Sequence, residues 1–208
     1  MGGIMGSFGA RHPYDRSAEP PVDGEQEQGW NEDADPETVA RTILLDQLSM
    51  TARTRHELEQ RLARRRVPEE IAERLLDRFE EVGLVDDEAF ARSWVESRQR
   101  SRGLARPALA VELRRKGVDD DTVREVLAEV EPDDERATAR ALVQRKLRSM
   151  RGLEATVATR RLVGMLARKG YGAGLAYAVV REELEAARVE GAEELDARAG
   201  AEWAGDHD

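Results

Sequence analysis

The chain has 208 residues, of which 40% are hydrophobic, 37% are charged and 4% are aromatic, and it contains no cysteine. This composition excludes disulfides, cysteine-ligated metals and thiol nucleophiles, and it disfavours a large sheet because runs of Val, Ile and Thr are absent. The net charge of −10 is uneven, since residues 1–39 carry −7, residues 185–208 carry −6 and residues 40–184 carry +3. The middle of the chain is therefore compatible with a polyanionic partner.

The two ends of the chain, residues 1–34 and 189–208, are predicted to be disordered acidic tails because they contain few apolar residues. Trp30 and Trp203 lie in these tails, and each is interpreted either as a loosely packed side chain or as an anchor for a partner. No apolar run approaches the roughly 18 residues that a membrane span needs, and the N-terminus lacks a signal-peptide pattern. We expect a cytoplasmic protein without a membrane partner.

Helix signals define a first predicted three-helix unit, residues 35–85. Asp35 is an N-cap before a proline, and a capping box beginning at Thr54 opens the second helix. Pro68 opens the third helix, and Gly83 ends it in the left-handed conformation.

The same pattern restarts in a second predicted unit, residues 86–131. Asp86 caps its first helix, Pro107 opens the second, and either Asp119 or Asp120 caps the third. In a third unit, residues 132–188, we expect Asp133 to cap the first helix. The chain between the tails therefore reads as nine helices in three groups of three.

The three units align in one register, in which Val67, Val118 and Tyr171 are equivalent positions. Four further apolar positions and one basic position recur at fixed offsets from these anchors, which is the signature of a repeat. The equivalent sets are Leu58, Leu109 and Leu162; Leu62, Leu113 and Leu166; Arg64, Arg115 and Arg168; Leu75, Val126 and Val179; and Leu76, Leu127 and Val180. The predicted fold is all-α, an elongated, curved array of three tandem three-helix repeats.

The sequence offers no recognisable catalytic group. His12, His56 and His207 are scattered along the chain, and acid pairs such as Asp86 and Asp87 lie where N-caps belong. We therefore expect a protein that is not an enzyme and that needs neither a cofactor nor a metal.

Clusters of basic side chains are the remaining binding candidates, and three of the five clusters lie at the C-terminal end of a repeat's second helix. One interpretation is compensation of the helix dipole, and the other is a ladder of positive patches that faces a polyanion. The scarcity of aromatic residues argues against base stacking as the main contact. The candidates are Arg64, Arg65, Arg66, Arg98, Arg102, Arg114, Arg115, Lys116, Arg168 and Lys169.

Three segments resemble signatures of the RecX family of regulatory proteins. They are the run from Val82 to Trp94 (VGLVDDEAFARSW), the run from Leu109 to Val118 (LAVELRRKGV), and the run from Glu57 to Leu62 with the basic turn that follows it. The resemblance covers residues 38–186 and is most specific in the second repeat.

The resemblance implies a non-enzymatic regulator that binds the filament formed by the RecA recombinase on DNA and inhibits strand exchange and the linked ATP hydrolysis. It implies roles in DNA repair, DNA recombination and the SOS response. RecA is then the expected partner, with DNA as a weak or filament-associated one, and the protein is expected to be a monomer. The residues alone leave an alternative open, a DNA-binding helical repeat protein that acts independently of RecA.

The first repeat departs from the family pattern at one turn. Arg65-Arg66 stands where the later repeats have Lys116-Gly117 and Lys169-Gly170. This departure predicts a different turn in the first repeat.

Overall fold

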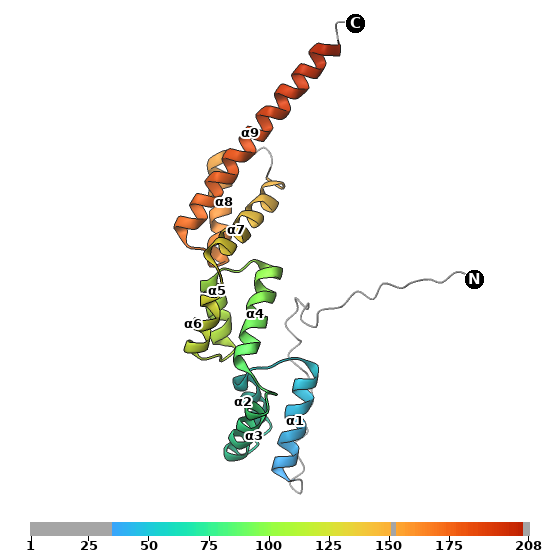
Figure 1. Ribbon diagram of the computed structural model, residues 1–208, viewed down its shortest axis with the longest axis vertical. Helices are drawn as coiled ribbons and strands as arrows, with labels where there is room; N and C mark the ends of the chain where they lie inside the picture. Colours follow the sequence, from blue (N-terminus) through green and yellow to red (C-terminus); the bar gives the residue numbers. More distant parts are fainter. Residues whose placement is uncertain (1–34, 151–152, 206–208) are drawn as a thin grey trace, which may run out of the picture.

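The computed structural model of the protein describes residues 35–150 and 153–205, with side-chain burial through residue 189. The predicted N-terminal tail and Trp30 lie outside the described residues, as does the side chain of Trp203. Figure 1 shows an elongated array in which helical triplets follow one another along the long axis. The described helices are α1 (Pro36–Met50), α2 (Arg55–Arg64), α3 (Glu69–Glu81), α4 (Asp87–Arg102), α5 (Arg106–Arg115), α6 (Asp120–Ala128), α7 (Pro132–Leu147), α8 (Ala155–Arg168) and α9 (Ala173–Gly205).

Each triplet of helices encloses its own hydrophobic core. One cluster of buried side chains belongs to α1–α3, a second to α4–α6 and a third to α7–α9, and the third also includes Ala105, which directly precedes α5. In the described residues every element is a helix, and the triplets follow one another along the array. The prediction of an elongated all-α array of three three-helix repeats is confirmed.

The repeat register deduced from fixed offsets coincides with the packing. Every apolar residue in the equivalent sets is at most 9% exposed. The three equivalent arginines, Arg64, Arg115 and Arg168, are all exposed. One sequence pattern therefore buries the same helix faces in each repeat and turns the same basic position toward solvent.

Most helix starts follow the predicted capping residues. The Asp35 carboxylate accepts the Thr38 N–H at 3.1 Å, and Asp86 accepts the Ala89 N–H at 2.8 Å. Thr54 forms the expected capping box at the start of α2. Of the two acids considered for α6, Asp119 is the cap.

One predicted cap is wrong. Asp133 lies within the first turn of α7, whose N-cap is Glu131 and whose first residue is Pro132. Proline suits the first helical position because its fixed φ matches the helix and it has no N–H to satisfy there. Asp133 therefore contributes only favourable charge near the helix N-terminus.

The last helix continues past residue 188, where the third repeat was predicted to end. α9 runs to Gly205, through a segment rich in Ala and Glu that favours helix. Among the described helices, none is both long and apolar enough to span a membrane.

The turn after α2 corrects the prediction made for Arg65-Arg66. Arg66 has a φ of 58°, in the left-handed region, as do Gly117 at 82° and Gly170 at 90°. The first repeat therefore makes the same turn as the other two, with a residue that suffers a steric penalty for it.

Candidate binding surface and repeat junctions

The first two repeats meet where the N-terminus of α2 contacts the C-terminal turn of α5. The fully buried Thr54 donates from Oγ1 to the Lys116 carbonyl at 2.6 Å. The Arg55 N–H donates to Asp87 Oδ1 at 2.8 Å, and Lys116 Nζ pairs with Glu57 Oε1 at 2.7 Å. Burial raises the pKa of Asp87, against the opposing effect of that Arg55 N–H.

A cluster around Trp94 holds three of the predicted binding residues. Arg98 lies 4.1 Å and Lys116 lies 4.8 Å from the centre of the Trp94 ring. Trp94 Nε1 donates to Glu112 at 3.0 Å, and the same carboxylate lies 3.1 Å from Arg98 Nε. Arg102 is 3.5 Å from Glu112. Arg98, Arg102 and Lys116 are thus engaged within the protein by ion pairs and cation–π contacts.

The second and third repeats meet in the same way, one repeat further along. The buried Ala105, equivalent to Thr54, donates its N–H to the Lys169 carbonyl at 2.9 Å. Arg106 donates both its backbone N–H and its Nε to Glu135, each at 3.1 Å. Each junction therefore joins the start of one second helix to the end of the next.

Tyr171 adds a contact that the first junction lacks. Its hydroxyl donates to the Gly103 carbonyl at 3.1 Å. Burial, together with the charge of Glu135, raises the pKa of Tyr171 to about 12. The hydroxyl therefore stays protonated and remains a donor at neutral pH.

Glycine is required at two turns because the preceding repeat approaches closely. A Cβ on Gly117 would overlap His56 Cβ, and a Cβ on Gly170 would lie 2.8 Å from Ala108 Cβ. The equivalent turn of the first repeat meets no preceding repeat in the described residues, and Arg66 is exposed there. A side chain is sterically tolerated at that turn for this reason.

Some of the predicted binding residues are exposed and without an ion pair in the described part of the chain, whereas others contact groups of the protein itself. Within the described residues, four exposed side chains make no ion pair, and these are Arg64, Arg66, Arg115 and Arg168. Arg114 pairs with Asp120 at 2.6 Å, and Lys169 donates to the Arg102 carbonyl. Arg65 is half-buried. The binding role of all ten residues stays a prediction.

The junction residues Thr54 and Ala105 were not among the sequence candidates. Both directly precede a second helix, 51 residues apart, and this common position was the available signal. Their chemistry differs because one donates from a side chain and the other from the backbone. Among the described residues, no three His, Cys, Asp or Glu side chains are grouped as metal ligands.

Stacked three-helix units with separate cores, polar junctions and exposed cations define a helical repeat protein. Models of the first, second and third three-helix domains of RecX match residues 40–79, 86–127 and 133–180, respectively. The chain belongs to the RecX family.

Close relatives cover most of the chain. It is 57% identical over 151 residues to the regulatory protein RecX of Thermobifida fusca (strain YX), which covers 73% of this chain and 82% of the relative. It is 54% identical over 151 residues to that of Streptomyces coelicolor, covering 73% and 80%. A crystal structure of RecX from Lactobacillus salivarius has a TM-score of 0.66 at 18% identity, covers 71% of this chain and 96% of that one, and shows the shared fold.

Proposed function

We propose that the protein binds the RecA–DNA filament and inhibits its recombinase and ATPase activity, acting as a cytoplasmic monomer without an enzymatic activity of its own. The observation that carries this proposal is the match of all three repeats to RecX domains. Relatives named regulatory proteins support it at up to 57% identity.

The shape of the array supports a filamentous partner. A filament presents the same groove repeatedly, and a repeat protein presents the same side chain repeatedly. Arg64, Arg115 and Arg168 are equivalent, exposed and unpaired within the described residues. Individually weak contacts at these positions add through effective concentration. We propose that these three residues contact the filament, whereas Lys116, paired with Glu57, holds the first two repeats together.

Binding of labelled protein to RecA filaments preassembled on single-stranded DNA tests the proposal. The variant R64Q/R115Q/R168Q should bind the filament more weakly than the wild-type protein. The matched control is R78Q/R124Q/R188Q, which removes one exposed arginine per repeat from local pairs with Glu81, Asp121 and Glu185. Equal affinity of the wild-type protein for filaments and for bare DNA would contradict the proposal.

The alternative function is DNA binding without RecA, and the charge of the third repeat favours it, because residues 132–188 contain 12 basic and 7 acidic residues. In that case bare DNA binds tightly, the affinity falls steeply with salt, and added RecA changes nothing. Failure to bind DNA at low salt would remove this alternative.

A further inference from the structure

The three repeats share one fold but differ in charge. Residues 35–85 and residues 86–131 each contain 9 basic and 11 acidic residues, which gives −2 for each stretch. Residues 132–188 contain 12 basic and 7 acidic residues, which gives +5. The positive charge of the middle of the chain is therefore a property of the third repeat.

The cations of the second and third repeats also differ in how they are neutralised. In the second repeat, Arg115 is the one cation without an ion pair in the described residues. On α7 and α8, or directly after α7, six cations make no ion pair within the described residues. They are Arg145, Lys146, Arg148, Arg160, Arg161 and Arg168.

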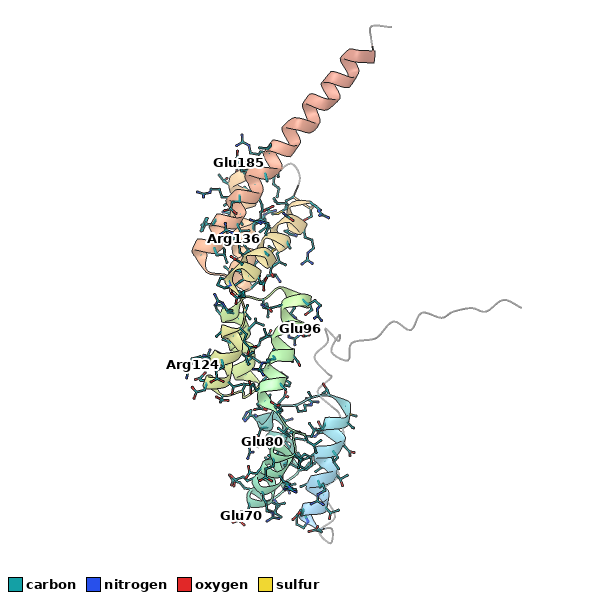
Figure 2. All side chains as sticks on the ribbon, in the orientation of Figure 1. Glu70, Glu80, Glu96, Arg124, Arg136 and Glu185 are labelled. Carbon is teal, nitrogen blue, oxygen red and sulfur yellow. The ribbon has the colours of Figure 1, made fainter. Side chains whose placement is uncertain are left out.

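Several acidic residues of the third repeat form ion pairs with cations other than these six. Glu182 on α9 lies 2.6 Å from Arg136 on α7, and Glu183 lies 3.0 Å from Arg140. Arg136 is labelled in Figure 2, where it lies on α7. Glu135 is held by Arg106 of the second repeat. These pairs involve Arg136 and Arg140, whereas the cations at the C-terminal end of α7 make no ion pair in the part of the chain whose side chains are described.

Two lysines in equivalent positions show the difference most clearly. Lys116 is neutralised by Glu57 across the first junction. The residue equivalent to Glu57 at the second junction is Ala108, which carries no charge. Lys169, the counterpart of Lys116, has no carboxylate partner in the described part of the chain and donates to a carbonyl.

Further positive charges surround Lys169. Its Nζ donates to the carbonyl of Arg102, and the charges of Arg145 and Arg102 act on it. Burial, followed by these two charges, lowers the pKa of Lys169. Three cations therefore lie near one another at the second junction, where Glu112, 3.5 Å from Arg102, is the nearest carboxylate in an ion pair with any of them.

We propose that the third repeat is the surface on which the protein contacts a nucleic-acid strand, with Lys169, Arg145 and the free arginines of α8 neutralising successive phosphates. The inference rests on the proposed function, since the filament contains DNA, and it assigns the DNA contact to one repeat.

Two features favour a phosphate backbone over other anions. Five of the six free cations are arginines, whose planar guanidinium matches phosphate oxygens in bidentate geometry. Arg161 and Arg168 are seven residues apart on α8, so they lie on the same helix face at about 10 Å. Cations repeated along a helix suit charges repeated along a strand, and contact with phosphates gives binding without sequence preference.

The test measures the affinity of the full-length protein for an oligothymidylate of about 30 nucleotides in the absence of RecA. Fluorescence anisotropy reports the binding, and the measurement is repeated over a range of salt concentrations. The surface variant is R145Q/R161Q/R168Q, which alters exposed residues only. The control variant R78Q/R100Q/R124Q removes the same charge from exposed arginines that are paired in the first two repeats. Thermal unfolding verifies that both variants are folded.

We expect the surface variant to lose at least tenfold in affinity at about 50 mM salt, and its slope of log K against log salt to fall by about 2. The control variant should stay within twofold of the wild-type protein. An equal loss in both variants would assign the effect to net charge and overturn the inference, as would absence of binding by the wild-type protein.

Measuring DNA affinity and inhibition of RecA ATPase in parallel distinguishes a failure of the surface assignment from a failure of the proposed function. If the surface variant keeps its DNA affinity and still inhibits RecA ATPase, the surface assignment fails and the proposed function stands. If it keeps its DNA affinity but no longer inhibits, the third repeat contacts an acidic protein surface instead, which also overturns the inference. If the DNA effect appears and the wild-type protein does not inhibit RecA, the surface assignment stands and the proposed function fails.

Discussion

The left-handed position after each second helix shows how neighbouring repeats constrain a single residue. Gly117 and Gly170 sit against His56 and Ala108 of the preceding repeat at distances that leave no room for a Cβ. Arg66 occupies the same conformation at an exposed turn. The glycines are therefore set by junction packing as well as by φ.

The variant G117A should be destabilised more than G83A. Gly83 also has a positive φ, but a Cβ added there would have no other atom within 4 Å, so G83A should cost about 1 kcal/mol, the conformational penalty alone. G117A adds a steric conflict with His56 and should cost about 1–3 kcal/mol more. Urea unfolding measures both, and equal values would contradict the close approach at the junction.

The variant R66G should be more stable than the wild-type protein by about 1 kcal/mol, because glycine adopts the left-handed conformation without steric penalty. R66A is the control, since it removes the side chain and keeps a Cβ. Thermal unfolding compares the three proteins. A loss of stability in R66G would indicate that the arginine side chain makes a contact that outweighs the backbone strain.

Asp119 gives stability a pH dependence of predictable sign. Hydrogen bonds from the side chain and backbone of Thr122 lower the pKa of Asp119 below its usual value. The Asp119 carboxylate therefore binds a proton less tightly in the folded state than in the unfolded state. Its contribution to the free energy of unfolding is present at neutral pH and is lost as the pH falls below about 4. The stability difference between the wild-type protein and D119A should shrink over that range. A difference independent of pH would contradict this assignment.

The starts of α2 and α5 are the elements that join the repeats. Thr54 Oγ1 accepts the Glu57 N–H within its own helix and donates to the Lys116 carbonyl of the next repeat. One hydroxyl therefore caps a helix and links two repeats.

The variant T54V should be destabilised by about 1–3 kcal/mol, because it removes the cap and leaves buried polar groups without partners. T54S keeps the hydroxyl and should lose much less. Urea unfolding of both variants measures the effect. A larger loss in T54S than in T54V would contradict this, because serine lacks the methyl group that valine keeps, and it would mean that the methyl group stabilises the junction more than the hydrogen bonds do.

Local rules were sufficient to predict most of the elements. The N-caps at Asp35, Thr54 and Asp86 require only nearby residues, and the repeat register required only offsets. The N-cap at Glu131 was missed because Asp133 has the better capping chemistry, while Pro132 fixes the start of α7.

The site was less predictable because it depends on contacts between repeats. Lys116 and Lys169 have the same place in the sequence pattern and were expected to act alike. Lys116 pairs with a carboxylate, whereas Lys169 has no carboxylate partner among the described residues, because Glu57 and Ala108 differ across the junction. Summing the charge over each repeat would have identified the third repeat as the most positively charged one from the sequence alone.

At the scale of the whole molecule, three separate cores are joined by polar junctions into one long array (Figure 1). The first two repeats each carry a net charge of −2, whereas the third carries +5. We propose that the two properties serve different contacts, in which the length of the array follows a filament and the third repeat contacts DNA.

The most direct measurement is a titration of the DNA-dependent ATPase of RecA with the full-length protein. The account predicts that ATP hydrolysis falls at substoichiometric protein, and that R64Q/R115Q/R168Q inhibits less than R78Q/R124Q/R188Q. ATP hydrolysis that stays unchanged at equimolar protein would contradict it.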